Sequence, residues 1–230
     1  MSRGEGVTIV TGGTGGLGVG VVGALADAGH DIIVTWIVER ELENFPSDLR
    51  GRCRLERCDV LDADDFGRLV EASGPVWGMV PLVGGYLDGH PLGDQSTEDW
   101  DRQFALNARS VAIALGAVLP GMAARGAGRV VAVGSRAAWR PFPGASAYAA
   151  SKAAVIALVE AASEEVRRDG VAVNCVLPSV IDTPANRAAN PDADHGSWVR
   201  PREIGEVVAF LCSREASAVT GAAIPVYGRA

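Results

Sequence analysis

Short apolar runs alternate with helix-like segments along the whole chain, and this alternation restricts the fold more than any other feature. The runs are nearly continuous in Val, Ile, Leu and Ala, without regular polar alternation, as is typical of parallel strands buried on both faces. Repeated strand–helix units predict a doubly wound α/β sheet, seven-stranded and mostly parallel, with helices on both faces. The expected strands are Val7–Thr11, Asp31–Trp36, Cys53–Arg57, Val76–Val83, Arg129–Gly134, Val171–Leu177 and Ala222–Tyr227.

The intervening segments predict helices, and one stretch is irregular. Pro120 lies inside the longest helical segment and predicts a kink or a break there. Segment 179–200 is rich in Pro, Asn, Asp and Ala and is too long for an ordinary connection, so we interpret it as a substrate lid on a single domain spanning 1–230. The expected helices are Leu17–Ala28, Ala63–Glu71, Thr97–Arg125, Ala145–Asp169 and Pro201–Ser213.

Composition excludes several classes of function. The net charge is −7 and the pI about 5.0, which disfavours a nucleic-acid or anionic-membrane surface. We expect no apolar stretch long enough to span a bilayer and no signal peptide. The four cysteines form no Cys-x-x-Cys pair, which indicates reduced thiols and a cytoplasmic protein. The three histidines have no metal-ligand spacing, so no metal site is expected.

A glycine-rich loop joins the first expected strand to the first helix. It reads Thr11-Gly12-Gly13-Thr14-Gly15-Gly16-Leu17-Gly18 and fits both Gly-x-x-x-Gly-x-Gly and Gly-x-Gly-x-x-Gly. Either pattern is weak alone, but between a strand and a helix it is strong. The glycines allow a tight turn and close approach of a pyrophosphate, which the helix N-terminus then binds. A simple packing turn is the less favoured alternative.

The residues after the second and third strands bear on which dinucleotide binds. Asp59 could accept a hydrogen bond from an adenine amino group or could simply cap the next helix. Trp36 ends the second strand, where an acidic residue would select NAD. Arg40 could meet a 2′-phosphate, although Glu39 adjoins it. The cofactor is therefore NADP or NAD, with a slight preference for NADP.

Lys152 is the one lysine among 21 basic residues, and it lies four residues after Tyr148. On a helix, this spacing places a phenol and an ammonium on one face. A cation there stabilises the phenolate and lowers the tyrosine pKa. Arginine cannot supply a compact ammonium whose pKa shifts. The pair is therefore a candidate acid/base couple.

These motifs and their spacing resemble the short-chain dehydrogenase/reductase family, and the resemblance covers essentially the whole chain. A serine precedes the tyrosine by thirteen residues, as Ser135 precedes Tyr148, and an asparagine lies in the long middle helix, as Asn107 does. The other matching positions are Asp59-Val60 after the third strand and the loop Pro178-Ser179-Val180-Ile181-Asp182-Thr183 after the sixth. The family's Asn-Asn-Ala-Gly motif is replaced here by Leu82-Val83-Gly84-Gly85.

The resemblance implies a Rossmann-type fold and roles for named residues. Tyr148 would be the general acid or base, and Lys152 would assist it and bind the nicotinamide ribose. Ser135 would hydrogen-bond the substrate oxygen, and Asn107 would hold a water that relays protons to Lys152. Thr183 would touch the nicotinamide carboxamide. The residues implied to bind the cofactor are Gly12, Thr14, Gly15, Gly16, Leu17, Gly18, Trp36, Arg40, Asp59, Val60, Val83, Gly84, Tyr148, Lys152, Pro178, Val180 and Thr183.

Three functions remain open at this point. The first is an NAD(P)-dependent carbonyl reductase or alcohol dehydrogenase. The second is a dihydropteridine-type reductase, since the lid and the Gly84-Gly85-Tyr86 turn are similar to those of dihydropteridine reductases; those enzymes generally lack the serine. The third is a dinucleotide-sensing protein without turnover, which an intact proton route disfavours. Candidate residues for the substrate pocket are Tyr86, Arg136, Trp139 and Trp198.

The two longest helices carry more apolar residues than one face of a sheet needs to cover. A partner subunit would bury the remainder. The family resemblance implies a homodimer or homotetramer built on these helices. The expected partners are thus a second copy of the chain and a small carbonyl or alcohol substrate.

Overall fold

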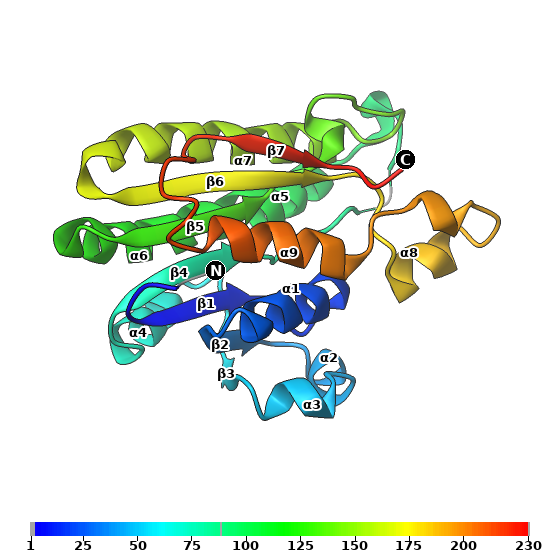
Figure 1. Cartoon of the computed structure of the whole chain (residues 1–230). Coiled ribbons are helices and arrows are strands. Elements are labelled where there is room, and N and C mark those ends of the chain that lie inside the picture. The colour runs from blue at the N-terminus through cyan, green and yellow to red at the C-terminus, as the bar shows by residue number, and fades with distance from the viewer. Residues whose placement is uncertain (1–2, 88, 230) are drawn as a thin grey trace.

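The computed structural model describes residues 3–87 and 89–229 and contains one seven-stranded sheet in which every pairing is parallel. The strand order is β3-β2-β1-β4-β5-β6-β7 (Figure 1). This confirms the doubly wound α/β fold. The strands are β1 (Val7–Thr11), β2 (Asp31–Trp36), β3 (Arg54–Arg57), β4 (Val76–Pro81), β5 (Gly128–Val133), β6 (Val171–Pro178) and β7 (Ala223–Val226).

The order of the strands reverses between β1 and β4, and this reversal positions the site. β1 is followed in space by β2 on one side and by β4 on the other. In open parallel sheets, ligands bind outside the carboxyl ends of the strands at such a switch point. The glycine loop after β1 and the Leu82–Gly85 turn after β4 therefore meet at one edge of the sheet.

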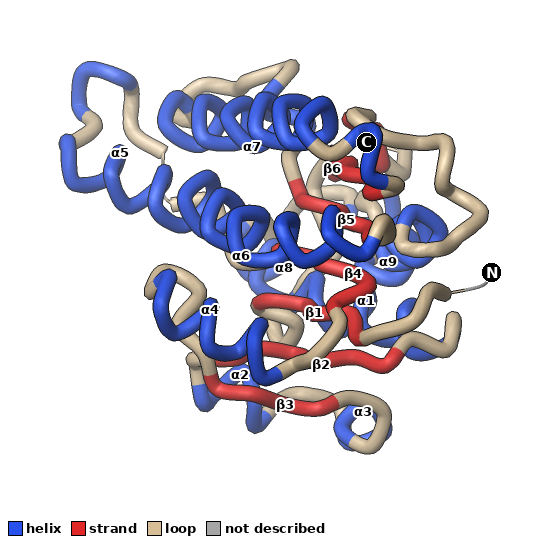
Figure 2. Tube along the Cα trace, turned by 90° about the vertical axis from the view of Figure 1, so that its left-hand side faces the viewer, coloured by secondary structure: helices blue, strands red, loops and turns tan. Residues whose placement is uncertain are grey.

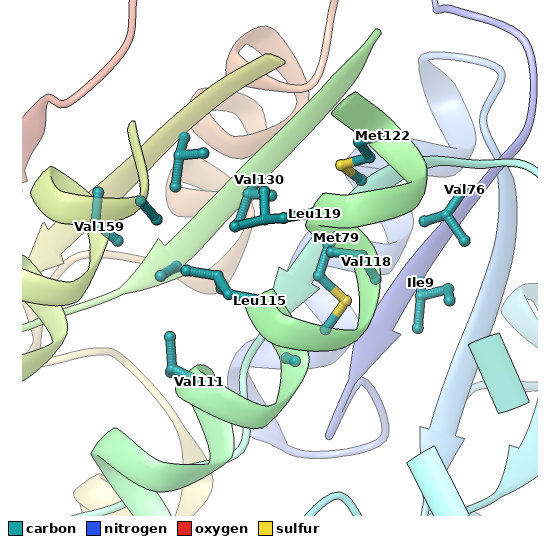
Figure 3. Close-up of a cluster of buried hydrophobic side chains, with 14 of the residues drawn as sticks. Ile9, Val76, Met79, Val111, Leu115, Val118, Leu119, Met122, Val130 and Val159 are labelled. Carbon is teal, nitrogen blue, oxygen red and sulfur yellow. The ribbon is translucent and has the colours of Figure 1, made fainter. Parts of the chain in front are cut away.

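Helices cover the two faces of the sheet unequally (Figures 1 and 2). On one face, α1 (Gly16–Asp27) packs against α9 (Pro201–Leu211), and their contact encloses one apolar core. On the other face lie α4 (Ala63–Ala72), α6 (Ser110–Arg125) and α7 (Ser146–Glu165). Figure 3 shows Leu115, Val118 and Leu119 of α6 directed at Met79 and Val130 of the sheet.

The long middle segment is continuous but not uniform. It consists of α5 (Thr97–Phe104), a five-residue π-helical turn (Ala105–Arg109) and α6. A break at Pro120 is wrong, because α6 continues through it. Pro120 has no N–H to donate to the carbonyl of Gly116. Both residues are exposed, so water can hydrogen-bond to that carbonyl instead. The irregularity lies at Asn107 instead, and π-turns are frequent at functional sites.

Several short elements were not predicted. Two short helices, α2 (Glu39–Glu43) and α3 (Ser47–Arg50), follow β2. Segment 179–200 holds α8 (Pro184–Ala189) and one 3₁₀ turn (His195–Ser197), and a bridge between Ile181 and Val199 closes its base. Further 3₁₀ turns cover Leu92–Asp94, Arg136–Ala138 and Arg167–Asp169.

One helical stretch, Thr97–Arg125, has the length and composition of a membrane span. The expectation that no segment meets this criterion is therefore wrong. The stretch connects β4 to β5 and buries one face against the sheet, including Val111, Leu115 and Met122. A core helix of a folded domain meets the same criterion, so the finding is weak evidence for insertion.

Candidate active site

The glycine loop after β1 forms a cradle whose glycines pack too closely against the neighbouring chain to carry side chains. Gly12 has a left-handed backbone, with φ of 64°, and a Cβ there would lie 3.0 Å from Val83 Cγ2. A Cβ on Gly16 would lie 3.0 Å from Thr183 Cγ2. Gly18 lies directly against the backbone of Gly13. The loop is thus in close contact with the β4 turn and with the Thr183 side chain at the start of the lid segment.

Two side chains of this loop contact neighbouring elements. The hydroxyl of Thr14 donates a hydrogen bond of 3.2 Å to the carboxylate of Glu41 in α2. Leu17, the second residue of α1, packs against the apolar core under that helix. The free N–H groups at the start of α1 remain directed at the cradle, because no side chain caps the helix at Gly15.

The residues expected around the adenosine lie at the same edge. Val60 is buried, and Asp59 is exposed after β3 with its Oδ1 accepting from Leu61 N at 2.9 Å. The cap of α4 is Asp62, so the alternative role of Asp59 as that cap does not apply. Trp36 is half-buried at the end of β2. Within residues 3–87 and 89–229, the exposed Arg40 side chain makes no hydrogen bond or ion pair.

Asn107 lies at the centre of the site, completely buried in the π-turn. Its Oδ1 accepts from Gly85 N at 2.9 Å, and its Nδ2 donates to Gly85 O at 3.1 Å and to Ser151 Oγ at 3.0 Å. Gln103, one turn earlier, also donates to Gly85 O. These bonds fix the β4 turn where the family's usual asparagine is replaced. Both amide hydrogens are used, which leaves a lone pair on Oδ1 for the expected relay water.

Lys152 is buried in α7 and donates a 2.8 Å hydrogen bond to the carbonyl of Val133 at the end of β5. A Cβ on Gly84 would lie 3.3 Å from Lys152 Nζ and 2.5 Å from Asn107 Oδ1. Lys152 and Asn107 therefore converge on the backbone of Gly84. Burial lowers the pKa of Lys152 to about 8, so its ammonium titrates close to neutral pH.

Ser135 and Tyr148 adjoin this group from β5 and α7. Ser135 is buried, and its hydroxyl accepts from Ala137 N at 3.1 Å, which caps the following 3₁₀ turn. Ser151 Oγ, which accepts from Asn107, donates to the carbonyl of Tyr148 at 2.8 Å. The structure thus brings Asn107, Ser135, Tyr148 and Lys152 to one place at the carboxyl edge of the sheet.

The electrostatics of Tyr148 differ from the sequence-based expectation. Burial raises the pKa of the Tyr148 phenol above its usual value, the Ser135 hydroxyl partly offsets this, and nearby Tyr86 adds to the rise. Lys152 is not among the groups that lower this pKa, and its ammonium donates to the Val133 carbonyl. The expectation that the lysine lowers this pKa is not met in the protein alone. A phenol with a raised pKa stays protonated at neutral pH and can donate its proton.

The four candidate pocket residues have different surroundings. Tyr86 is 46% exposed and meets the Tyr148 ring edge-on, with centroids 5.3 Å apart. Arg136 lies over the Tyr227 ring. Trp139 is exposed, and Trp198 is buried inside the lid segment against His195. Tyr86 alone of these four lines the small cavity beside Tyr148, whose lining comprises Tyr86, Leu87, Gln95, Asp99, Gln103, Gly144, Ala147 and Tyr148.

The loop after β6 brings its candidates to the base of the lid segment. Pro178 ends the strand and is buried, whereas Val180 is exposed. Thr183 caps α8 by accepting from Asn186 N at 3.3 Å, and it also contacts the position where Gly16 would carry a side chain. Thr183 therefore caps α8 and also lies against the glycine loop.

Comparison with known proteins agrees with this geometry. The short chain dehydrogenase family model matches residues 6–194. The chain belongs to the short-chain dehydrogenase/reductase family. This dehydrogenase/reductase is 30% identical over 239 residues to dehydrogenase/reductase SDR family member 4 of Bos taurus, with 96% of this chain and 86% of the relative covered. It is 31% identical over 248 residues to 4-formylbenzenesulfonate dehydrogenase of Comamonas testosteroni, covering 99% and 98%.

Solved structures give the same result. A 3-oxoacyl-(acyl-carrier-protein) reductase from Agrobacterium tumefaciens with NADP bound superimposes with a TM-score of 0.89 at 27% identity, covering 100% of this chain and 95% of that one. This dehydrogenase/reductase is thus an oxidoreductase that uses NAD(P). The glycine cradle fits such a dinucleotide, because no side chain caps the start of α1 at Gly15, so its free N–H groups are available to a pyrophosphate at the switch point.

Sequence reasoning missed part of the site. Glu41, Gln103 and Ser151 were not singled out, although they bond to Thr14, Gly85 and Asn107, respectively. Gln103 and Ser151 each share a helix face with a predicted residue at a spacing of four or three, which a helical-face argument could have found. Glu41 gave no such signal, because α2 itself was not predicted.

Proposed function

We propose that this dehydrogenase/reductase transfers a hydride between a nicotinamide and a carbonyl or alcohol substrate, with Tyr148 as proton donor and acceptor. The observation that carries the proposal is the convergence of Ser135, Tyr148, Lys152 and Asn107 beside the glycine cradle. A non-catalytic sensor would need the cradle but not a buried ammonium and a half-buried phenol beside it.

NAD(P)H supplies the hydride when bound, and the protein must protonate the oxygen of the reduced carbonyl. Tyr148 donates that proton, a contribution of roughly 10²–10⁴-fold for general acids. Its raised pKa keeps the phenol protonated at neutral pH, which suits reduction. Ser135 donates a hydrogen bond to the same substrate oxygen and stabilises its developing charge.

Lys152 and Asn107 act behind the phenol. The Lys152 ammonium, with a pKa of about 8, is mostly charged at neutral pH and lies one helical turn from Tyr148. It also binds the nicotinamide ribose hydroxyls in this proposal. Asn107 holds the Gly84–Gly85 turn in place and presents its remaining Oδ1 lone pair to a relay water.

Exposed aromatic rings beside Tyr148 support an apolar or planar substrate. The Tyr86 ring contacts both Tyr148 and Phe142. Its centroid lies 5.3 Å from that of Tyr148 and 5.6 Å from that of Phe142. Tyr86 and Phe142 are each about half exposed. We propose that they wall one side of the substrate site, with segment 179–200 as the lid over the other.

A nicotinamide absorbance assay tests this function. It should be run with NADH and NADPH over ketones, alcohols, quinones and a quinonoid dihydropteridine. We expect turnover of ketones or aldehydes, and Tyr148→Phe should abolish it while leaving the dissociation constant of the cofactor nearly unchanged. Full turnover by Tyr148→Phe would contradict the proposal. Ser135→Ala should cause a large loss on ketones; a mild effect together with pteridine turnover would favour the dihydropteridine-type reaction.

The assembly and location follow as further proposals. The outer faces of α6 and α7 present small apolar residues to solvent, among them Ala112, Gly116, Ala153 and Ala157. We propose that a second copy of the chain covers these faces in a homodimer or homotetramer. All four cysteines are free, which supports a reducing compartment, the cytoplasm.

A further inference from the structure

The carboxylate of Glu41 lies against the glycine loop. Thr14 Oγ1 donates to Glu41 Oε2 at 3.2 Å, and a Cβ on Gly15 would lie 3.9 Å from the same oxygen. Glu41 belongs to the short helix α2, which begins three residues after β2 ends. A carboxylate that comes after the second strand therefore reaches back over the loop that follows the first strand.

This position is decisive for the choice between the two dinucleotides. In folds of this kind, an acidic residue after the second strand accepts hydrogen bonds from the adenosine ribose, while an arginine there accommodates the 2′-phosphate of NADP. Trp36, at the end of β2, carries no charge for either task. The candidates are therefore two neighbours in α2, Arg40 and Glu41.

The structure distinguishes these neighbours. Successive residues of a helix point about 100° apart, and it is Glu41 whose side chain contacts the loop. In the described part of the chain, the Arg40 side chain forms no bond to the loop or to any other residue. The helix reads Glu39-Arg40-Glu41-Leu42-Glu43, so it carries three carboxylates and one guanidinium.

We propose that Glu41 determines cofactor choice and makes the protein prefer NAD(H) to NADP(H). Its carboxylate accepts hydrogen bonds from the adenosine ribose hydroxyls, with Thr14 holding it in position. A 2′-phosphate at the same place would bring a second anion beside Glu41 and be repelled. The inference depends on the family's dinucleotide site and not on the carbonyl substrate or on Tyr148.

Equilibrium binding tests this without turnover. Dissociation constants for NADH and NADPH would be measured by isothermal titration calorimetry with the wild type and with Glu41→Gln, Glu43→Gln and Arg40→Gln. We expect the wild type to bind NADH about tenfold or more tightly than NADPH, because like-charge contacts cost enough free energy for such a ratio. Glu41→Gln should weaken NADH, strengthen NADPH and remove most of that ratio.

Glu43→Gln is the matched control, and Arg40→Gln tests the alternative that the arginine selects NADP. Glu43→Gln removes the same charge from the same helix without touching Thr14, so the ratio should stay within about twofold of the wild type, as expected of an exposed charge. Arg40→Gln should leave NADPH binding unchanged. All three positions are exposed, so the variants should fold, and melting temperatures would verify this.

Several outcomes would overturn the inference. They are tighter wild-type binding of NADPH, an equal effect of Glu41→Gln on both cofactors, or a selective loss of NADPH binding in Arg40→Gln. Because the titration measures binding alone, a protein that reduces no carbonyl can still show the expected ratio. Failure of the proposed reaction and failure of the cofactor inference are therefore separable.

Discussion

Asn107 holds Gly85 by both of its backbone groups, accepting from the N–H at 2.9 Å and donating to the carbonyl at 3.1 Å. One buried amide side chain therefore makes the two backbone hydrogen bonds that a neighbouring strand would make in a sheet. The turn after β4 lies close to Lys152, because a Cβ on Gly84 would lie 3.3 Å from Lys152 Nζ. Its position depends on a side chain from a different element, the π-turn between α5 and α6.

Replacement of this amide should loosen the turn. Asn107→Leu removes the partners of Gly85 and Ser151 from a fully buried position. We expect a loss of about 1–3 kcal/mol in the free energy of unfolding, the cost of leaving buried polar groups unpaired. Urea unfolding measures this loss, and cofactor binding should weaken in parallel. Unchanged stability and unchanged binding would show that the turn holds its shape alone.

Adjacent glycines in that turn should respond differently to the same substitution. Gly84→Ala would press a methyl group against Asn107 Oδ1 and Lys152 Nζ, whereas a Cβ on Gly85 meets nothing within 4 Å. Overpacking of this kind costs about 1–3 kcal/mol. We expect Gly84→Ala to lose most activity and cofactor affinity and Gly85→Ala to retain both. Equal behaviour of the two variants in the nicotinamide assay would contradict the geometry.

The buried lysine should make stability depend on pH. The pKa of Lys152 is about 8 in the folded protein against 10.5 for the free group, so between these values the unfolded chain binds more protons and stability rises with pH. Relative to Lys152→Met, which cannot titrate, the wild type should gain up to about 1.4 kcal/mol per pH unit in this window. Below pH 8 the difference should be flat.

Urea unfolding of both proteins from pH 7 to pH 10.5 checks this slope. Lys152→Arg serves as the control, because arginine keeps its charge throughout and its difference from Lys152→Met should not change with pH. Lys152→Arg should also be severely impaired in turnover. A wild-type difference that stays constant up to pH 10.5 would mean that the ammonium is not held in a desolvated site.

The proposed assembly predicts the effect of a charge on the outer face of α7. Ala157 is exposed in the described chain and lies among small apolar residues. Ala157→Arg should shift the protein to monomers in light scattering coupled to size-exclusion chromatography, since an unpaired charge at a buried interface is costly. Ala189→Arg, on the exposed surface of α8, should not. A wild type that is already monomeric would contradict the proposal.

The sequence predicts the parts of this molecule that depend on periodicity and fixed spacing. All seven strands and the five long helical segments lie within a few residues of their expected positions, because apolar runs and glycine stops are local signals. Asn107, Ser135, Tyr148 and Lys152 come together because each follows or faces the carboxyl edge of the sheet. Those contacts are consequences of strand order.

Other features were beyond a local reading. The helix α2 has five mostly charged residues and no buried side chain, so no apolar pattern marks it, and the contact of Glu41 with Thr14 could not be foreseen. The direction of the Tyr148 pKa shift depends on burial and on where the Lys152 ammonium points. Neither is determined by a spacing of four residues.

The five-residue π-turn at Ala105–Arg109 has a consequence for any attempt to re-engineer the long helix. An extra residue in this turn offsets the register of α5 from that of α6, so Gln103 and Asn107 address the β4 turn while Val111 and Leu115 still enter the core. Deleting one residue there would restore a regular helix and rotate one half by roughly 100°. Grafts and chimaeras must therefore transplant this segment whole, with its irregular turn intact.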